Sequence, residues 1–463
     1  MKLEKKQKII AQRNDFMIID AIEISGYKNL SNVKLDLSDI TALVAPNGFG
    51  KSNVLEAFDF CMDFIKSPSR NKKTMMQYPI AIPINKYLKT RECQFKLKMT
   101  ALHEEALCNV EYAFSFEWEN DANTGAKIIS EHLKIKLSAK PVTHISRSED
   151  KALFKSATSG RCSSPININD DELVINKLML HDKLFYYDII QKINSLGLYR
   201  ENRMDVENCF DPTPIRYRKL SSESLEMESI ENIPRHLYKI KVKYPKKYEM
   251  LMHAFKTLFS NIINIDIYEV DIKNIRVERT TTKYESGDAA EAIEQTEATN
   301  YTELPFTIEN KAYEMYITDE NLNQSVPLLF LSEGSRRVLL LLTIVMSAEI
   351  NKISVIALEE PENFIHPDLL QSLIRILSDF AGDCKILISS HSSHLIGYLK
   401  PGNVYISVPN SKGIASFSNI VGKGSKKIID DASKYDQTLG DYIFSLLSGD
   451  DDDFEMIRMY MGV

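Results

Sequence analysis

The sequence has six cysteines in 463 residues, and they form neither a C-x-x-C pair nor a Cys/His cluster at metal-ligand spacing. A zinc centre and a disulfide-stapled domain are therefore not indicated, and reduced thiols are expected. The longest apolar run, residues 338–346, is too short to cross a bilayer, and the first residues lack the apolar core of a signal peptide. We expect a soluble, cytoplasmic protein without a membrane partner.

Two further absences narrow the class of protein. The chain has no internal repeat of fixed period and no heptad pattern over several turns, so a long coiled-coil arm is not expected. Its formal net charge is −7, which argues against binding nucleic acid through overall charge, although it leaves a local basic groove open. The length is sufficient for two or three packed units.

A glycine-rich segment, residues 45–52, lies between an apolar strand over 40–44 and a helix with apolar residues at helical spacing. The backbone N–H groups of such a loop and helix start bind an anion. Lys51 is placed to reach the β- and γ-phosphates of a nucleotide, and Ser52 offers its hydroxyl to Mg²⁺. Ala45 stands where the pattern usually has glycine, so it must do without left-handed backbone freedom. The predicted phosphate contacts are Asn47, Gly48, Phe49, Gly50, Lys51, Ser52 and Asn53.

Polar residues also follow two apolar strands in the C-terminal half. The run over 353–358 is typical of a buried parallel strand, and carboxylates at the end of such a strand lie where α/β sheets bind ligands. We expect Glu359 to hold Mg²⁺ and Glu360 to orient and deprotonate the attacking water. His391 follows the next strand and is expected to contact the γ-phosphate or that water. The alternatives are a solvated strand end and a structural histidine.

Ser332, Glu333 and Gly334 precede a strongly apolar helix and present donors to an anion at its N-terminus. Taken alone, these three residues are equally typical of an ordinary helix cap formed by Ser332. Their position before the carboxylate-ending strand favours the anion-binding alternative.

The spacing of apolar residues and the local composition predict the strands, helices and domains of the chain. Runs over 17–24 and 32–38, followed by 92–100, 110–118 and 127–137, predict strands and an antiparallel layer. The composition over 139–172 indicates a loop or linker, residues 173–262 look mostly helical, and strands and helices alternate over 305–400. The predicted units are an N-terminal lobe with the phosphate loop (1–138), an inserted, mostly helical domain (139–262), a C-terminal lobe (263–425) and a helical tail (426–463).

The order of phosphate loop, L-S-x-G, E-E-P-E and S-S-H resembles the ABC-type ATPase heads of the SMC and RecF group, and within it the OLD-like branch. The resemblance covers roughly residues 17–66 and 325–400. It implies an α/β fold, with a mixed sheet and an antiparallel β layer split by a largely helical insertion, and it implies ATP and Mg²⁺ as cofactors. Lys28 falls where this group often carries a basic residue near the phosphates, and Gln77 and Gln94 are both candidates for the Q-loop glutamine.

In such heads the L-S-x-G segment of one protomer closes over the nucleotide of another, which implies a homo-oligomer of at least two copies. Ser332 and Gly334 would then reach the γ-phosphate across the interface. The chain also resembles the ATPase subunits of two-gene anti-phage systems of the PARIS and Septu type. That resemblance implies a sensor that holds a separate nuclease or toxin protein and responds to a phage-derived trigger, with no nuclease domain in this chain. The alternative is a RecF-like ATPase that binds DNA in repair.

Three charged segments bear on that choice. Basic residues over 235–247 interleave with Tyr238, Tyr244 and Tyr248, which suits nucleic acid or, as we prefer, a solvated helix face with half-buried tyrosines. The acidic stretch over 280–303 suits a basic protein partner or a loop without one. Residues 450–453 are four aspartates, which indicate a solvated acidic turn rather than a metal site.

Overall fold

The computed structural model describes residues 17–77, 83–88, 91–119, 124–137, 140–149, 151–201, 209–210, 215–217, 233–271, 306–308 and 311–462. The chain divides into two compact units, the first formed by Met1–Met204 with Ile344–Val463 and the second by Asp205–Thr343. The strands of the first unit are β1 (Met17–Ser25), β2 (Val33–Asp36), β3 (Ile40–Val44), β4 (Glu92–His103), β5 (Ala106–Glu117), β6 (Lys127–Lys136), β7 (Val142–Ser148), β8 (Lys151–Phe154), β9 (Ser164–Pro165), β10 (Leu198–Glu201), β16 (Val355–Glu359), β17 (Lys385–Ser389), β18 (Val404–Ile406) and β19 (Ser418–Asn419). Its helices are α2 (Lys51–Lys66), α3 (Ser69–Met76), α4 (Val174–Leu178), α5 (Tyr187–Ser195), α10 (Pro367–Ala381), α11 (Ser393–Gly397), α12 (Lys423–Lys434), α13 (Leu439–Leu447) and α14 (Asp451–Met461).

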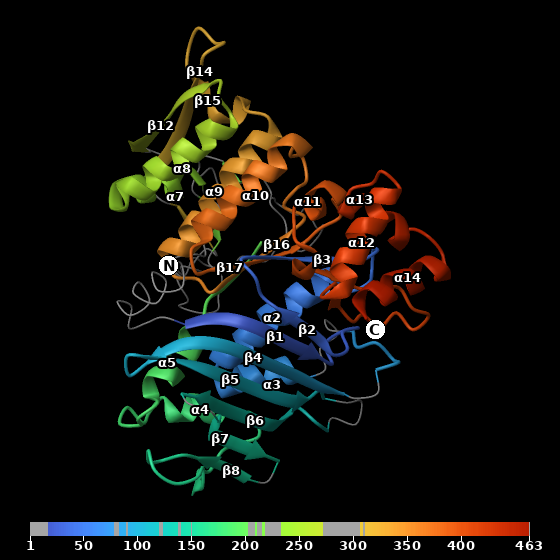
Figure 1. The fold of residues 1–463 in the computed structure, drawn as a ribbon. Coiled ribbons are helices and arrows are strands. Elements are labelled where there is room, and N and C mark those ends of the chain that lie inside the picture. The colour runs from blue at the N-terminus through green and yellow to red at the C-terminus, as the bar shows by residue number, and fades with distance from the viewer. Residues whose placement is uncertain are drawn as a thin grey trace, which may run out of the picture. The chain divides into compact units, whose positions relative to one another are not determined.

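An antiparallel sheet of eight strands, in the order β2-β1-β4-β5-β6-β7-β8-β9, forms one layer of the first unit (Figure 1). In β4 the side chains of Cys93, Phe95 and Leu97 are buried, whereas Gln94 is exposed on the other face. This two-residue alternation is the pattern that predicts the antiparallel layer, and the layer is confirmed.

The sheet extends further along the chain than the sequence predicts, because β7, β8 and β9 lie in the segment expected to be a linker. The inward positions of β7 include His144 and Arg147, both buried. Arg147 donates to the backbone carbonyls of Asn169 and Glu172, which gives two of its buried nitrogens acceptors inside the unit. Polar residues at inward positions hide the apolar alternation on which the strand prediction depends.

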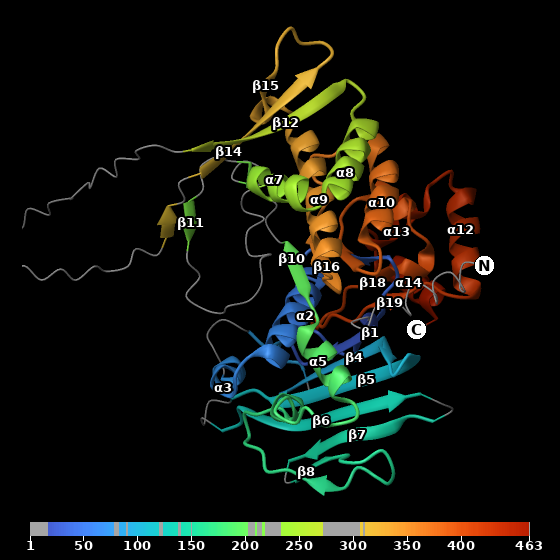
Figure 2. The same cartoon turned by 90° about the vertical axis from the view of Figure 1, so that its left-hand side faces the viewer.

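A second sheet has the order β10-β16-β17-β3-β18-β19, and its first five strands are parallel. Figure 2 shows β10 beside β16 at one edge of this sheet. The strand that carries the phosphate loop, β3, lies in the interior between β17 and β18. Since the strands are parallel, β3, β16 and β17 end at the same edge, where the predicted site residues follow them.

Helix α2 packs between the two sheets of the first unit (Figures 1 and 2). Phe64 of this helix stacks on Phe114 and Phe116 of β5, with ring centroids 5.1 and 4.9 Å apart. Each buried phenylalanine contributes about 1.5–3 kcal/mol of transfer free energy, and stacking adds about 0.5–1.5 kcal/mol. The helix that begins at the phosphate loop is therefore fixed by a large aromatic core.

The second unit holds α7 (Ile233–Lys243), α8 (Pro245–Leu258) and the strands β11 (Ile215–Tyr217), β12 (Ile262–Asp271), β13 (Phe306–Ile308), β14 (Lys311–Asp319) and β15 (Val326–Pro327), with the 3₁₀ turn η1 (Leu328–Phe330). Helix α9 (Glu333–Ile350) runs from this unit into the first. The strands form an antiparallel sheet, β12-β14-β15, and a separate pair, β11-β13. The unit therefore combines helices with strands.

The observed units differ from the predicted boundaries at 139, 263 and 426. Strand β10 pairs with β16, which keeps the chain before Met204 in the first unit. Strands β12 and β14 pair with each other, so they belong to the second unit rather than to a C-terminal lobe. The predicted helical tail does form three helices, but they pack in the first unit, where α13 contacts α11. Long-range strand pairing, which local composition does not report, sets these divisions.

Candidate nucleotide site

The phosphate loop connects β3 to α2 with a backbone that only glycine adopts readily. Gly48 and Gly50 have φ angles of 79° and 91°, in the left-handed region. At Gly50 an added Cβ would lie 2.5 Å from the Cβ of Ala415, so space as well as conformation requires glycine there. Ala45 is buried and does not occur among the described residues with positive φ, so alanine fits its position without strain.

Lys51 occupies the first turn of α2 and is buried. Its ammonium donates to the backbone carbonyls of Ala45 and Pro46, at 2.6 and 3.4 Å. Burial lowers the pKa of Lys51 to about 8, and the carboxylates of Glu360 and Glu362 partly oppose that shift. The same lysine is therefore held by its own loop and lies within electrostatic reach of the carboxylates that follow β16.

Neighbouring side chains brace the loop from the turn after β1. The amide of Asn53 donates to Asn29 at 2.8 Å, and Asn29 in turn donates to the carbonyl of Gly413 at 3.0 Å. The ammonium of Lys28 lies 2.6 Å from a carboxylate oxygen of Glu56 on α2. In this structure Lys28 therefore pairs within the protein, and its contact with phosphates stays a prediction.

The two carboxylates at the end of β16 have different surroundings. Glu359 forms an ion pair with Arg200 of β10, with a nitrogen–oxygen distance of 2.9 Å. Glu360 has a left-handed φ of 47°, and its N–H donates to the carbonyl of Ser389 at the end of β17. The backbone thus turns sharply between the two residues, which sends their side chains in different directions. Arg200 was not predicted, because nothing local marks it.

Glu360 and His391 meet across the turns that follow β16 and β17. Their Oε1 and Nε2 atoms are 3.7 Å apart, and both side chains are partly exposed, at 43% and 37%. Burial lowers the pKa of His391, and the charge of Lys51 lowers it further, which favours the neutral imidazole near pH 7. The structure therefore brings both predicted catalytic residues together with Lys51 at one edge of the parallel sheet.

Ser332, Glu333 and Gly334 lie at the start of α9. The Ser332 hydroxyl accepts from the N–H of Ser335 at 3.2 Å, so Ser332 caps the helix. This is the helix-cap alternative of the sequence analysis. Ser332 and Glu333 are also exposed, so they are accessible to a second molecule. The cap and the predicted contact with a second protomer's nucleotide are compatible, and the latter stays a prediction.

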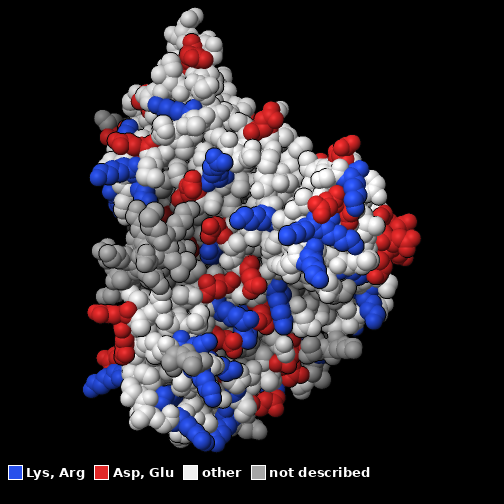
Figure 3. All heavy atoms as spheres, viewed as in Figure 1, with Lys and Arg blue, Asp and Glu red and all other residues white. Residues whose placement is uncertain are grey.

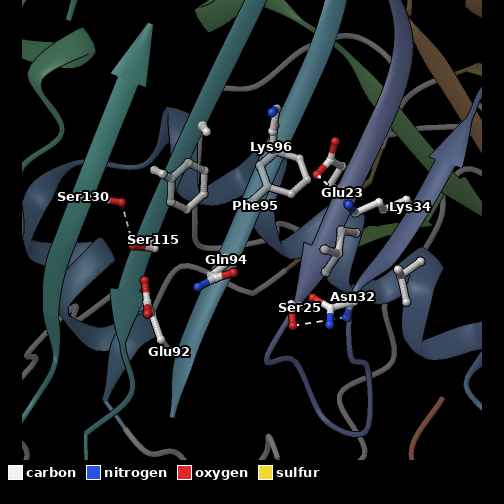
Figure 4. Close-up of a pocket in the computed structure, with 14 residues that line it drawn as sticks. Glu23, Ser25, Asn32, Lys34, Glu92, Gln94, Phe95, Lys96, Ser115 and Ser130 are labelled. Atoms are coloured by element: carbon white, nitrogen blue, oxygen red, sulfur yellow. Dashed lines mark hydrogen bonds and ion pairs between the residues drawn. The ribbon is translucent and has the colours of Figure 1, made fainter. Parts of the chain in front are cut away.

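Of the two glutamines considered for the Q-loop, Gln94 lies on the outer face of the antiparallel sheet. It lines a hollow of about 210 Å³ together with Ser25 and Asn32 (Figure 4). Its neighbours Cys93 and Phe95 point to the opposite face and join the core around α2. Gln94 therefore points away from the phosphate-loop helix, which argues against this assignment. Gln77 is the C-cap residue of α3.

The lysines over the outer face of the antiparallel sheet are intermixed with acidic residues (Figure 3). Lys98 pairs with Glu23 at 2.9 Å, and Lys96 pairs with Glu111 at 3.0 Å. Such exposed pairs contribute little stability, about 0–1 kcal/mol each. Their effect is to neutralise the charge of this face, so it is not a basic groove.

The remaining charged segments have structural roles where they are described. Tyr248 is buried, and the ring of Tyr238 packs on Tyr313 at 5.2 Å, which fits the solvated-helix interpretation of the basic segment. Asp450 caps α14 in a capping box with Asp453, so these aspartates form a helix start. The acidic stretch over 280–303 lies outside the described residues. No helix of the described chain is both long and apolar enough to cross a membrane.

Comparison with known proteins places this site in a family. The family model described as AAA ATPase domain matches residues 17–396. The endonuclease GajA of Bacillus cereus (strain HuB5-5) is 21% identical over an alignment of 440 positions that covers 88% of this chain. The chain spans 59% of the length of GajA.

Solved structures of an Smc head domain and of RecF are also similar to this chain. An Smc head domain from Pyrococcus furiosus, described as bound to the C-terminal domain of ScpA, has a TM-score of 0.45 and 11% identity, with 90% of this chain and 100% of that chain covered. The recombination mediator protein RecF has a TM-score of 0.36 and 12% identity, with 88% and 98% covered. The family model spans the phosphate loop, Glu359, Glu360 and His391, and on that match the chain belongs to the AAA ATPase domain family.

Proposed function

We propose that this chain binds and hydrolyses ATP at the edge formed by β3, β16 and β17. The observation that carries the proposal is the 3.7 Å approach of Glu360 and His391, beside a phosphate loop whose Lys51 lies within electrostatic reach of Glu360. The loop amides and Lys51 hold phosphate oxygens, and Glu360 orients the attacking water and accepts its proton. Losing one group that stabilises the developing charge lowers the rate by roughly 10²–10³.

Mg²⁺ is the metal that such a site uses, and the residues present fit it. Ser52 is exposed in the first turn of α2, and Glu359 ends the neighbouring strand β16. A hydroxyl and a carboxylate are oxygen donors of the kind that Mg²⁺ prefers, with phosphate oxygens and water completing its shell. When bound, the ion neutralises charge on the phosphates. Glu359 must then exchange its partner, because its carboxylate faces Arg200 in this structure.

We further propose that two copies close over ATP. Ser332 and Glu333 are exposed at the N-terminus of α9, where backbone donors favour an anion. A γ-phosphate held by one copy would meet these donors from the other. Binding of ATP would therefore favour the assembled state, and hydrolysis would weaken it.

The biological role that we propose is anti-phage defence, as the regulatory subunit of a system with a separate nuclease or toxin protein. The similarity to GajA, named an endonuclease, at 21% identity supports a connection to nuclease action, and the resemblance to the PARIS and Septu ATPase subunits supports the defence role. The chain spans 59% of the length of GajA. We propose that a separate protein carries out the nuclease or toxin step.

A RecF-like role in DNA repair is the alternative. Lys241, Lys243 and Lys246 are exposed on α7 and α8, and such residues neutralise phosphates. This role requires DNA binding that ATP stimulates and that weakens steeply with salt.

The deciding experiment is native mass spectrometry of the chain co-expressed with the product of the neighbouring gene, with and without ATP. The wild type is compared with Glu360→Gln, which should trap the ATP-bound assembly. Ser332→Ala and Ser332→Asp should both abolish assembly, although Asp keeps the helix cap. A multimer that carries the neighbour and responds to ATP supports the proposal. A partner-free dimer that retains DNA contradicts the defence role and favours repair.

A further inference from the structure

Glu362, the last carboxylate of the E-E-P-E segment, has entered the site so far only through the effect of its charge on Lys51. Its residue is only 8% exposed, although carboxylates are rarely buried without strong hydrogen bonds. It lies in the same turn as Glu360, two residues further along the chain. Its contacts therefore bear on how that turn is held.

The buried carboxylate connects the turn after β16 to the turn after β17. Its Oε1 atom accepts from the hydroxyl of Ser390 at 2.7 Å and from the backbone N–H of His391 at 3.0 Å. The Ser390 hydroxyl is itself fully buried and accepts from the N–H of Ser392 at 3.0 Å. Ser392 then caps α11 by accepting from Leu395. One oxygen atom thus accepts from two successive residues, and the Ser390 hydroxyl links the third, Ser392, to the same connection.

This connection begins where the sheet ends. The last ladder pair between β16 and β17 is Glu359 with Ser389, and the Glu360 N–H donates to the Ser389 carbonyl. The hydrogen-bonded ladder between β16 and β17 ends at this point. Glu362 continues the connection through its side chain, up to the residue whose imidazole faces Glu360.

The second oxygen of the same carboxylate, Oε2, is buried and has no hydrogen-bond partner among the described residues. The Oε1 atom is the acceptor in both hydrogen bonds described above, to Ser390 and His391. An amide oxygen accepts in the same way, so a glutamine would preserve the connection without a buried charge. The site therefore offers a clean comparison between removing the charge and removing the acceptor.

We propose that Glu362 is a positioning residue: through Oε1 it fixes the backbone at His391 and so holds the imidazole against Glu360. This inference rests on the proposed ATPase function. Glu362 acts on the geometry of Glu360 and His391, the groups that contact the attacking water. The hydrogen bonds of Glu362 to Ser390 and His391 do not include the phosphate loop. A displacement of about 1 Å in such a group lowers a rate by roughly 10²-fold.

The test compares three variants of the whole chain. Glu362→Ala should lower kcat by about 10–100-fold and change KM for ATP by less than about threefold. Glu362→Gln should stay within about threefold of the wild type, because it retains the acceptor. Rescue by the amide separates a positioning role from a requirement for charge.

Glu131 provides the matched control. It is a fully buried carboxylate in the same unit that accepts from the N–H groups of Val174 and Ile175. Glu131→Ala should lower Tm, as the loss of buried acceptors does, but leave kcat of the folded fraction unchanged. Tm, affinity for a fluorescent ATP analogue and hydrogen exchange over residues 389–396 are measured for every variant.

The inference is overturned if folded Glu362→Ala keeps kcat within about twofold, or if Glu362→Gln loses as much activity as Glu362→Ala. A wild type that binds but never hydrolyses ATP refutes the proposed function instead. Hydrogen exchange then still decides the inference: the His391 amide must exchange faster in Glu362→Ala than in Glu131→Ala. Equal exchange rates would overturn it.

Discussion

At the scale of single residues, Lys51 couples the phosphate loop to the acidity of the solution. Its pKa of about 8 lies below the ordinary 10.5, because the ammonium is buried. Between about pH 8 and pH 10.5, Lys51 therefore binds more protons in the unfolded chain than in the folded chain. Stability consequently rises with pH across that window, while the charge that attracts phosphate is lost.

We expect the affinity for ATP to be constant below pH 8 and to fall above it, by up to about tenfold per pH unit. The reason is that the bound phosphates favour the charged lysine, so each proton lost from Lys51 opposes binding. The measurement is a titration with a fluorescent ATP analogue from about pH 6.5 to about pH 9.5. An affinity that stays flat up to the highest pH contradicts this expectation.

Arg200 gives a second prediction at this scale, because it occupies the carboxylate of Glu359. In Arg200→Ala we expect Mg²⁺ to support nucleotide binding at a concentration about 3–10-fold lower than in the wild type, since no cation competes for Glu359. Binding of the nucleotide analogue is measured against Mg²⁺ concentration. Lys385→Ala is the control, because its ion pair with Asp39 lies at the opposite end of β17. A higher requirement for Mg²⁺ in Arg200→Ala would contradict the competition between Arg200 and Mg²⁺ for Glu359.

The residues that the sequence identifies are those that directly follow an apolar strand. Lys51, Glu360 and His391 each have such a local signal, and the structure brings them together. Arg200 and Glu362 have none. Arg200 reaches Glu359 across 159 positions of the chain, and the role of Glu362 depends on a turn that belongs to another strand. Contacts of this kind follow from strand order, which no local pattern reports.

At the scale of elements, close packing of α13 on α11 links the C-terminal helices to the turn that carries His391. Helix α11 begins two residues after His391, and Gly440 of α13 lies against its first turn. A Cβ at Gly440 would lie 1.8 Å from the carbonyl oxygen of Ser393. The two helices can approach this closely only because position 440 has no side chain.

Gly440→Ala should therefore separate α13 from α11 and lower the free energy of unfolding by about 1–3 kcal/mol. We also expect a lower kcat, because α11 is the continuation of the His391 turn. Thermal unfolding and ATP turnover are the measurements. Gly402→Ala serves as the control, since a Cβ there would meet nothing closer than 3.9 Å. Equal Tm values for both variants would contradict the close packing.

Element prediction succeeds or fails with the polarity of the inward face. The alternation in β4 and β5 is apolar on the inward side, so these strands are predicted from sequence. In β7 two of the inward residues are His144 and Arg147, and the segment was predicted to be a linker instead. Hydrogen bonds to backbone carbonyls allow such residues to be buried.

At the scale of the whole molecule, charge is distributed rather than concentrated. The chain carries a net charge of −7, and lysines on the outer sheet face are paired with glutamates. We expect duplex DNA to be retained only weakly at about 150 mM salt, with or without ATP. Electrophoretic mobility shift over a salt series is the measurement. ATP-dependent binding of DNA that is lost when Lys241, Lys243 and Lys246 are neutralised would contradict this expectation. It would support the RecF-like role in DNA repair.

The interior position of β3 also constrains how the chain folds as it is made. This strand ends at Val44, but its neighbours β17 and β18 begin at Lys385 and Val404. The antiparallel sheet from β1 to β9 is complete long before either neighbour leaves the ribosome. Contacts between such distant residues form slowly, so a nascent chain exposes an apolar strand with two open edges for most of its synthesis. The nucleotide-binding edge is therefore assembled last, and chaperone dependence during translation is the expected consequence.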